Sequence, residues 1–165
     1  MFDDAPGTPA PRWLSDTEQE TWRAFLAFLT GLEERLDRQL QRDAGMPHAY
    51  YQVLAMLSEA PERTLRMSEL AAATTSSPSR LSHAVARLEE KGWVRRDRHP
   101  TDRRGSLAVL TPEGFAALVA AAPGHVHAVR EALFDRLTPT QLRHMRDVFR
   151  SLAHDDDPDR DTPAG

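Results

Sequence analysis

Apolar residues between positions 79 and 91 recur at the spacing of an amphipathic helix. Leu81, Ala84, Val85 and Leu88 follow the i, i+3, i+4, i+7 pattern and therefore share one side of the helix. Before this segment, Ser77 followed by Pro78 is typical of the start of a helix. The opposite side has no acidic residue in its first two turns. It carries the hydrogen-bond donors Ser79, Arg80, His83 and Arg87.

The following residues predict a β-hairpin with a basic tip. Residues 93–98 and 106–110 alternate like strands, and Pro100 and Gly105 bracket a turn between them. Arg103 and Arg104 lie at the tip of this turn, and arginine suits both phosphate contacts and a narrow minor groove. We expect Asp102 to pair with an arginine of the hairpin and, with Gly105, to fix the shape of the loop.

The charge of this region differs from that of the rest of the chain. Residues 80–104, here called the basic segment, hold seven arginines and one lysine against four acids, a net charge of +4. The whole chain has a formal net charge of −4, which leaves −8 for the remainder. A basic segment on an acidic protein is the electrostatic pattern of a local nucleic-acid contact surface.

The preceding residues complete a helix-turn-helix unit. Ser68 is expected to cap a short helix containing Leu70, and residues 74–77 form the turn. In such units the second helix enters the major groove and the first crosses the DNA backbone. Phosphate contacts are therefore expected from Ser68, Thr75 and Ser76, although each could instead simply cap a helix. Arg95, Arg96 and Arg98 are expected either to contact phosphates or to support the hairpin.

Long amphipathic helices flank this unit. Ser15 to Glu18 fits a capping box that opens a helix reaching about Gln41. A helix of about 26 residues is about 39 Å long, and its apolar stripe favours burial against a partner over the alternative of a monomer's core helix. Further segments predicted from the same spacing are a helix at 48–59, a short strand at 64–66, helices at 111–122 and 125–137 separated by a kink or short break at Pro123, and a helix at 138–152. Val126, Val129, Leu133 and Phe134 are expected to be buried.

Several short motifs together resemble the MarR family of dimeric winged helix-turn-helix transcriptional regulators. They are Leu70-Ala71, the run Leu88 to Arg96, the run Asp102 to Gly105, and the run Leu110 to Gly114. The resemblance covers roughly residues 15–153. It departs from the family at His83, where a basic residue is common, and at Trp93, where a smaller aliphatic residue is usual.

The resemblance implies a mainly α fold with a small β-wing. Residues 48–110 would form the winged-helix DNA-binding region, and the helices at 15–42 and 112–153 would form the dimerisation region. In this family small effectors, often phenolic or carboxylated, bind between the DNA-binding and dimerisation parts, where Trp22, Tyr50 or Tyr51 could line the crevice. Aromatic residues are more often part of a core, so no effector site is assigned to these three.

The two ends of the chain have the composition of unstructured segments. Residues 1–14 are expected to form a flexible arm and residues 154–165 a disordered acidic tail. We see neither a signal peptide nor an apolar run long enough to span a membrane, so a cytoplasmic location is expected. The chain has no cysteine, which excludes disulfides, thiol redox sensing and cysteine-ligated zinc.

No motif of the chain predicts an enzyme. The sequence lacks a glycine-rich phosphate loop, G-x-S-x-G and H-E-x-x-H, and the adjacent Glu89 and Glu90 are expected to be solvated. His125, His127 and His144 are interpreted as ordinary surface or interface residues, because an i, i+2 pair diverges on a helix. No metal or cofactor is expected.

We therefore expect a regulator, such as a repressor, that binds double-stranded DNA as a homodimer. Two recognition helices would enter successive major grooves of a pseudo-palindrome, and a small aromatic or phenolic effector would modulate binding. The alternative is a winged-helix module that binds protein and not DNA, which the acidic balance outside the basic segment favours.

Overall fold

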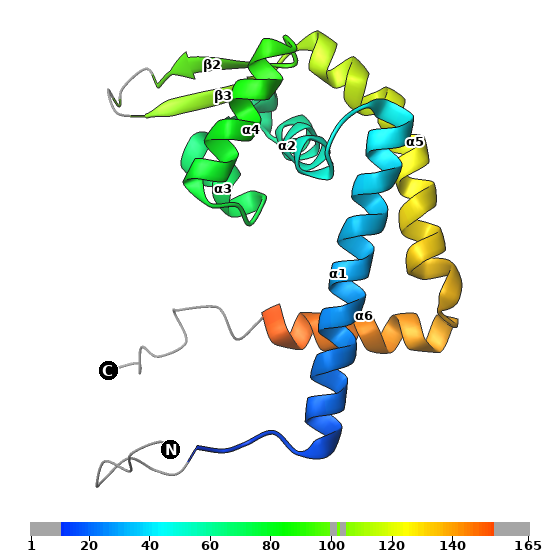
Figure 1. Ribbon diagram of the computed structural model, residues 1–165. Helices are drawn as coiled ribbons and strands as arrows, with labels where there is room; N and C mark the ends of the chain where they lie inside the picture. Colours follow the sequence, from blue (N-terminus) through cyan, green and yellow to red (C-terminus); the bar gives the residue numbers. More distant parts are fainter. Residues whose placement is uncertain (1–10, 100–101, 103–104, 154–165) are drawn as a thin grey trace, which may run out of the picture. The chain divides into compact units, whose positions relative to one another are not determined.

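The computed structural model describes residues 11–99, 102 and 105–153 (Figure 1). The chain divides into two compact units, residues 1–34 and 35–165, and the division falls within the first helix, α1 (Asp16–Ala44). The predicted tail at 154–165, most of the predicted arm at 1–14, and the hairpin residues Arg103 and Arg104 lie outside the described residues.

The first unit contains the N-terminal part of α1. This helix begins with the predicted capping box, in which the Ser15 backbone N–H donates to the Glu18 carboxylate at 2.8 Å and the Glu18 N–H donates to Ser15 Oγ at 3.4 Å. Its large apolar side chains remain exposed: Trp22, Phe25, Leu26, Phe28 and Leu29. The predicted apolar stripe of α1 is therefore present, and no other residues of its own unit cover it.

The second unit contains a winged helix. It runs through α2 (His48–Glu59), a 3-10 turn (Pro61–Arg63), β1 (Thr64–Arg66), α3 (Met67–Ala73), α4 (Pro78–Glu90), β2 (Val94–Arg98) and β3 (Ser106–Leu110). The antiparallel sheet has the order β1-β3-β2, with Leu65 opposite Ala108 and Arg96 opposite Ala108 on the other side. The predicted strand at 64–66 is confirmed, and β2 and β3 extend beside α4 as the wing (Figure 1).

Two helix boundaries bear on the predictions. The start of α4 is as predicted, because Ser77 Oγ accepts a hydrogen bond from the Arg80 N–H at 3.3 Å. The predicted cap of α3 was wrong: the helix begins at Met67, and the Glu69 carboxylate accepts from the Arg66 N–H at 3.0 Å. Ser68 therefore lies inside the first turn of α3 and is exposed.

One apolar core holds α2, α3, α4 and the sheet together with the end of α1 and the start of α5. The core face predicted for α4 is confirmed, since Leu81, Val85 and Leu88 are buried. The other buried members come from every neighbouring element: Leu40, Met46, Val53, Leu54, Leu57, Leu70, Ala71, Val94, Ala108, Leu110, Leu118 and Ala121. The winged helix is thus organised around one continuous set of aliphatic side chains.

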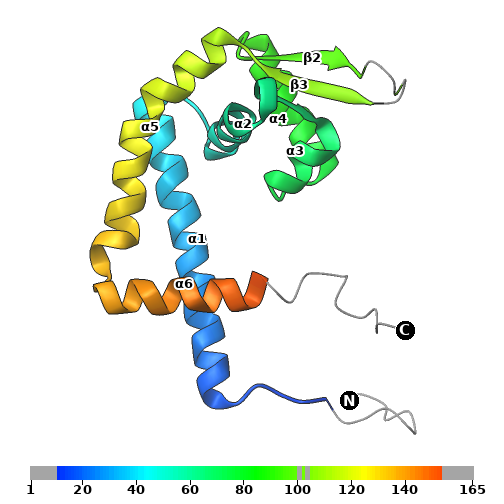
Figure 2. The ribbon, with the colours of Figure 1, turned by 180° about the vertical axis from the view of Figure 1, so that it is seen from behind.

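The C-terminal helices are α5 (Pro112–Ala132), a 3-10 turn (Phe134–Arg136) and α6 (Pro139–Ala153). The predicted interruption at Pro123 is not a break, because α5 is one helix through that residue and only changes direction along its length (Figures 1 and 2). Burial was also mispredicted: Val126 and Phe134 are exposed, and the small Ala128 and Ala132 are buried instead. None of the helices described here has the length and apolar character needed to cross a membrane.

Hydrogen bonds connect the start of α5 to the backbone that follows α4. Thr111 Oγ1 donates to the Gly92 carbonyl at 2.7 Å, and the Thr111 N–H donates to the Trp93 carbonyl at 3.1 Å. The Gly114 N–H donates in turn to Thr111 Oγ1 at 3.0 Å. A Cβ at Gly114 would collide with the Trp93 carbonyl, so the close approach requires glycine at this position.

Replacing Gly114 with alanine is expected to destabilise the protein by about 1–3 kcal/mol, as overpacking against backbone does. Urea unfolding of wild type and Gly114→Ala measures the difference. Gly31→Ala is the matched control, since a Cβ at Gly31 meets nothing within 4 Å in the chain. That control is expected to be neutral or stabilising by up to about 1 kcal/mol, and equal effects of the two changes would contradict the packing argument.

Candidate nucleic-acid interface

The polar face of α4 is open to solvent. Ser79, Arg80, His83 and Arg87 are all exposed, while the opposite face is buried in the core. Arg87 is partly neutralised, because its Nη1 lies 2.8 Å from the Glu90 carboxylate, and this interaction raises the pKa of Arg87. Glu90 therefore serves as a surface ion-pair partner. The face offers hydrogen-bond donors and two guanidinium groups to anything that approaches α4.

The turn between α3 and α4 has a strained backbone. Thr75 is exposed and has a φ of 50°, in the left-handed region that few residues other than glycine adopt. Ser76 is half-buried, and its hydroxyl donates to the Thr74 carbonyl at 3.3 Å. Of the three residues predicted to contact phosphates, Ser68 and Thr75 are thus open to solvent, and Ser76 is engaged within the turn.

Arg96 ties the wing to α4. Its Nη2 donates to the Ser82 carbonyl at 2.7 Å, and its Nε lies 3.0 Å from the Glu89 carboxylate. The same carboxylate accepts from the Arg96 backbone N–H at 3.1 Å. Of the two roles expected for Arg96, this geometry fits support of the hairpin. Glu89 is therefore a structural ion-pair partner and is not free for acid-base chemistry.

Arg95 and Arg98 project from the wing into solvent. Arg95 forms a two-pronged contact with Asp97, with distances of 2.8 and 2.7 Å. The hydrogen bond between them lowers the pKa of Asp97 and raises that of Arg95. Because both side chains are exposed, this pair can exchange Asp97 for another anion at little cost.

Backbone contacts close the base of the wing loop. The His99 N–H donates to the Gly105 carbonyl at 3.0 Å, and the Gly105 N–H donates to the Asp102 carbonyl at 2.9 Å. A Cβ at Gly105 would lie 2.9 Å from the Cβ of His99, so glycine suits this turn. Asp102 also forms an ion pair at 3.3 Å with Arg66 of β1.

The sequence did not indicate two contacts of this loop. Arg66, which pairs with Asp102, is 36 residues away in sequence and belongs to β1. The pairing of Asp102 with an arginine of the hairpin stays a prediction, because Arg103 and Arg104 lie outside the described residues. His99 Nδ1 accepts from the Asp102 N–H at 3.1 Å. The prediction that β1 joins the wing sheet was the available signal for Arg66, since it places that side chain beside β3.

The histidines on α5 have separate environments. The His125 ring lies between Tyr51, at a centroid distance of 4.2 Å, and His48, at 5.4 Å. Burial, and then the nearby His48, lowers the pKa of His125. His127 instead faces Glu131 at 3.3 Å, and His144 is exposed on α6. Within the described ranges, no three or more metal-ligating side chains gather into one cluster.

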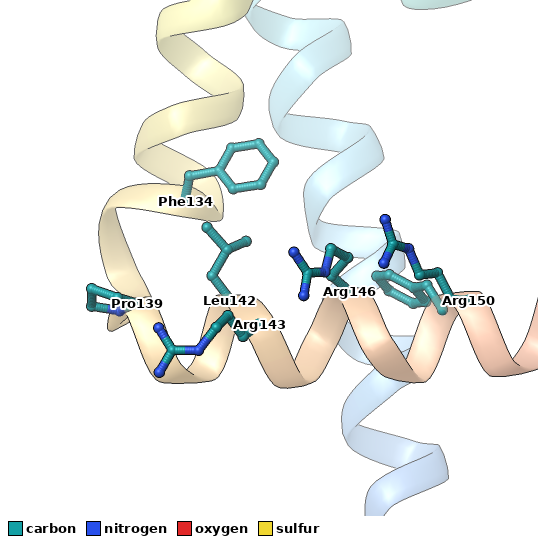
Figure 3. A pocket seen from close by; sticks show the side chains of 7 residues that line it. Phe134, Pro139, Leu142, Arg143, Arg146 and Arg150 are labelled. Atoms are coloured by element: carbon teal, nitrogen blue, oxygen red, sulfur yellow. The ribbon is translucent and has the colours of Figure 1, made fainter.

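An open apolar groove of about 750 Å³ runs along α6 (Figure 3). Phe134, Leu142 and Phe149 supply its apolar surface, and Arg143, Arg146 and Arg150 lie along it. Val148 and Leu152 on the same helix are also exposed. Exposed apolar side chains rimmed by charged residues are typical of a protein contact.

Solved structures similar to this chain include two from Streptomyces coelicolor. One is Sco3205, a MarR family transcriptional regulator in complex with DNA. It is 54% identical, with a TM-score of 0.84, and the match covers 92% of this chain and 95% of that one. The other is AbsC, a MarR family transcriptional regulator, which is 40% identical with a TM-score of 0.79 and coverage of 87% and 97%.

Sequence comparisons give a consistent result. The sequence model described as the MarR family matches residues 44–105. An HTH-type transcriptional regulator of Mycobacterium tuberculosis is 35% identical over 120 residues, which cover 72% of this chain and 80% of the relative. The residues matched by the family model run from the end of α1 to the loop before β3 and include α4 and β2.

Replacing Arg96 with methionine is expected to destabilise the protein by about 1–3 kcal/mol, because it removes the charge-assisted hydrogen bond to the Ser82 carbonyl and the ion pair with Glu89. Chemical unfolding measures the loss. Arg95→Met is the matched control on the same strand, and its exposed ion pair is worth at most about 1 kcal/mol. Equal stability of the two variants would show that the Arg96 contacts do not hold the wing.

His125 is expected to make stability depend on pH. Because its pKa is lowered in the folded chain, the unfolded chain binds the proton more readily. The contribution of His125 to the free energy of unfolding is complete at about pH 8. It is lost as the pH falls through the lowered pKa toward about pH 5. Urea unfolding across this pH range should show that the free energy of unfolding depends less on pH in His125→Gln than in wild type. The exposed His127→Gln serves as the control, and an unchanged dependence in His125→Gln would refute the assignment.

Proposed function

This chain belongs to the MarR family of transcriptional regulators, and we propose that it is a sequence-specific regulator that binds a pseudo-palindromic operator as a homodimer. The observation that carries the proposal is the open polar face of α4 beside the wing that Arg96 holds in place. Its similarity to Sco3205, a regulator solved in complex with DNA, supports the same assignment.

In the proposed complex, α4 lies in the major groove. Ser79, Arg80, His83 and Arg87 face the base edges, and arginine is well suited to guanine there. Phosphates are contacted by Arg95 and Arg98 on the wing and by Ser68, Thr75 and Ser76 near the turn. Arg103 and Arg104 are proposed to enter the flanking minor groove. The two half-sites are then separated by about one helical turn, roughly 34 Å.

In the free protein, two arginines of this surface form ion pairs with carboxylates that DNA can replace. The Asp97 carboxylate forms an ion pair with the guanidinium of Arg95, and the Glu90 carboxylate forms one with that of Arg87. Exposed pairs of this kind contribute about 0–1 kcal/mol each, so a DNA phosphate or base edge can replace the carboxylate without a large cost. Asp97 and Glu90 would thus pair with the arginines until DNA replaces these carboxylates.

The homodimer is supported by exposed apolar surface on both units. On α1, Trp22, Phe25 and Leu29 are uncovered within their own unit. On α6, the groove beside Phe134 and Phe149 is open as well. Burying such surface contributes about 25 cal/mol per Å², and a second copy of the chain is the partner that the proposed two-fold operator requires.

We also propose that a small aromatic or phenolic effector modulates DNA binding. Tyr50 and Tyr51 are half-buried on α2, and Tyr51 contacts His125 of α5. An effector bound near this contact would act on both the winged helix and α5. A coupling free energy of about 1–3 kcal/mol would change DNA affinity about 5–150-fold.

The deciding experiment is a gel shift on the DNA immediately upstream of the protein's own gene, at about 50 and 200 mM salt. Specific binding with two chains per site is expected to weaken at least about a thousandfold between these salt concentrations, as for proteins with several phosphate contacts. Arg80→Ala is expected to weaken specific binding by about 1–3 kcal/mol per half-site.

Arg23→Ala is the control, because Arg23 is an exposed arginine on α1 and does not belong to the winged helix. It removes the same charge and should leave the specific complex unchanged. Salt-insensitive binding, or equal losses in Arg80→Ala and Arg23→Ala, would contradict the proposed interface and favour a winged-helix module that binds protein.

A further inference from the structure

Helix α6 carries a row of arginines beside its apolar face. Arg143, Arg146 and Arg150 recur at i, i+3 and i+7, and at about 100° per residue they fall within about 60° of one another around the helix. All three are exposed and lie along the apolar groove (Figure 3). We call this row the α6 basic strip. Its centre is about 130° around the helix from the centre of the exposed apolar residues Leu142, Val148, Phe149 and Leu152.

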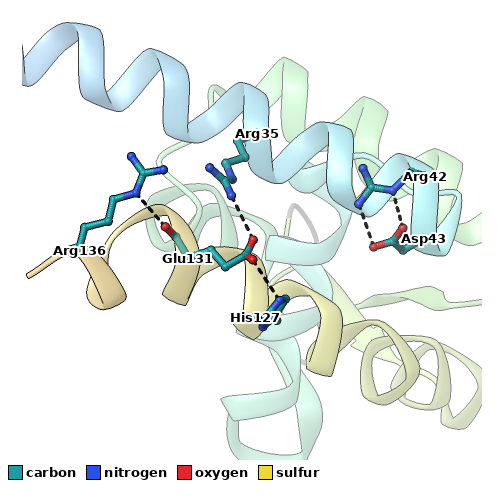
Figure 4. Close-up of polar contacts among 6 residues, drawn as sticks. All are labelled: Arg35, Arg42, Asp43, His127, Glu131 and Arg136. Atoms are coloured by element: carbon teal, nitrogen blue, oxygen red, sulfur yellow. Dashed lines mark hydrogen bonds and ion pairs between the residues drawn. The ribbon is translucent and has the colours of Figure 1, made fainter.

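Arginines on the neighbouring helices have acidic partners. Arg35 of α1 pairs with Glu131 of α5 at 3.1 Å, and Arg42 pairs with Asp43 at 2.8 Å (Figure 4). Each of these guanidinium groups therefore has a countercharge within the described part of the chain.

The α6 basic strip differs in this respect. Arg143 Nη2 donates to Thr140 Oγ1 at 2.9 Å, and no acidic side chain of the described residues pairs with Arg143 or Arg150. Arg146 contacts the carboxylate of the adjacent Asp147 at 3.1 Å, an exposed pair that contributes little. Two of the three guanidinium groups thus have no countercharge among residues 11–99, 102 and 105–153.

The segment that follows α6 is acidic and lies outside the described residues. Residues 154–165 contain five aspartates and one arginine, a net charge of −4, and no large apolar residue. Such a composition cannot form a core of its own, so charge is the main interaction available to it. Its first aspartates directly follow the C-terminal end of α6, where the partial negative charge of the helix dipole disfavours nearby acids. Pairing with the α6 basic strip would offset this repulsion.

The spacing of the aspartates matches that of the arginines. Asp155, Asp157 and Asp159 occupy every second position, which places them on one side of an extended chain at intervals of about 6–7 Å. The arginines of the strip are about 4.5 and 6 Å apart along the helix axis. Pro158 favours an extended conformation of the residue before it.

The segment is also long enough to reach the whole strip. Six residues separate Asp159 from Ala153, the last residue of α6, and an extended chain of that length spans about 20 Å. Arg143 is about 15 Å from Ala153 along the helix axis. A chain that turns back after α6 therefore reaches the far end of the strip.

We propose that the α6 basic strip binds the C-terminal segment of its own chain, residues 154–165, turned back along the helix. The proposed ion pairs join Asp155 to Arg150, Asp157 to Arg146, and Asp159 to Arg143. The covalent connection favours this occupant over a separate anion, because the segment begins one residue after α6 and therefore has a high local concentration at the strip.

The basic segment at residues 80–104 is the competing surface for these aspartates. Three of its described arginines already pair with carboxylates: Arg87, Arg95 and Arg96. Binding on α6 would also keep a charge of −4 away from the surface proposed to bind DNA. This last consequence rests on the proposed function, whereas the contact itself does not.

The test is paramagnetic NMR on the full chain. The chain has no cysteine, so Thr162→Cys provides a single attachment point for a nitroxide. The nitroxide is expected to broaden the amide signals of α6 near Arg143 most strongly. Salt at about 1 M should remove this broadening, because it screens charges beyond about 3 Å. No DNA is present, so failure of this test leaves the proposed DNA-binding function untouched.

A mixed sample shows which chain supplies the segment. It combines isotope-labelled chains without the nitroxide and unlabelled chains that carry it, so only contacts between chains broaden the observed signals. No broadening on α6 is expected in this sample.

Variants test the proposed ion pairs. Asp157→Asn should lower the ratio of bound to free segment about two- to fivefold, the effect of one exposed ion pair. Asp156→Asn is the matched control, because it removes the same charge from the opposite side of an extended segment. The Arg143→Gln, Arg146→Gln, Arg150→Gln triple variant should lose the broadening of α6, and circular dichroism confirms that each variant is folded.

Several results would overturn the proposal. Absence of broadening in wild type would show that the segment does not bind the described chain. Broadening that is strongest in α4 or β2 would place the segment on the basic segment instead. Broadening of α6 in the mixed sample would assign the contact to a second copy. Equal effects of Asp156→Asn and Asp157→Asn would show a general attraction between charges and not the paired contact.

Discussion

The winged helix depends on the contact between the start of α5 and the backbone that follows α4. Thr111 binds the carbonyls of Gly92 and Trp93, and Gly114 allows the two segments to approach. This contact fixes where the wing begins, because β2 starts directly after Trp93. It also fixes where α5 leaves the core. The orientation of both elements therefore rests on a site where even one methyl group does not fit.

The arginines of the basic segment that the structure describes divide into two groups by their contacts. Arg96 is turned inward and connects β2 to Glu89 and the Ser82 carbonyl. Arg80, Arg87, Arg95 and Arg98 are exposed. The inward arginine sets the distance between the wing and α4, and the exposed ones provide charge. Replacing an arginine in this segment therefore changes either the shape of the surface or its electrostatics, depending on the position.

Features set by local sequence were predictable. The spacing of apolar residues predicted α4 with its buried face, and the Ser15 and Ser77 caps followed from residue types known to accept helix N–H groups. Contacts between distant residues were not. Nothing near Asp102 indicates Arg66, and the pairing of Arg35 with Glu131 spans 96 residues. Pro123 was expected to cause a kink or a short break, because a proline in a helix removes one donor, and the helix remains continuous through it.

Arg66 connects three parts of the winged helix at once. Its backbone N–H caps α3 through Glu69, the residue lies opposite Leu107 in the sheet, and its guanidinium holds Asp102 at the base of the wing loop. The last of these links is a half-buried ion pair that solvent still reaches, so dissolved ions weaken it. Ionic strength then acts on the free protein before any partner arrives, by loosening the wing loop from α3. Part of the salt sensitivity of binding would therefore be an internal property of the wing, measurable as loop motion in the unbound chain.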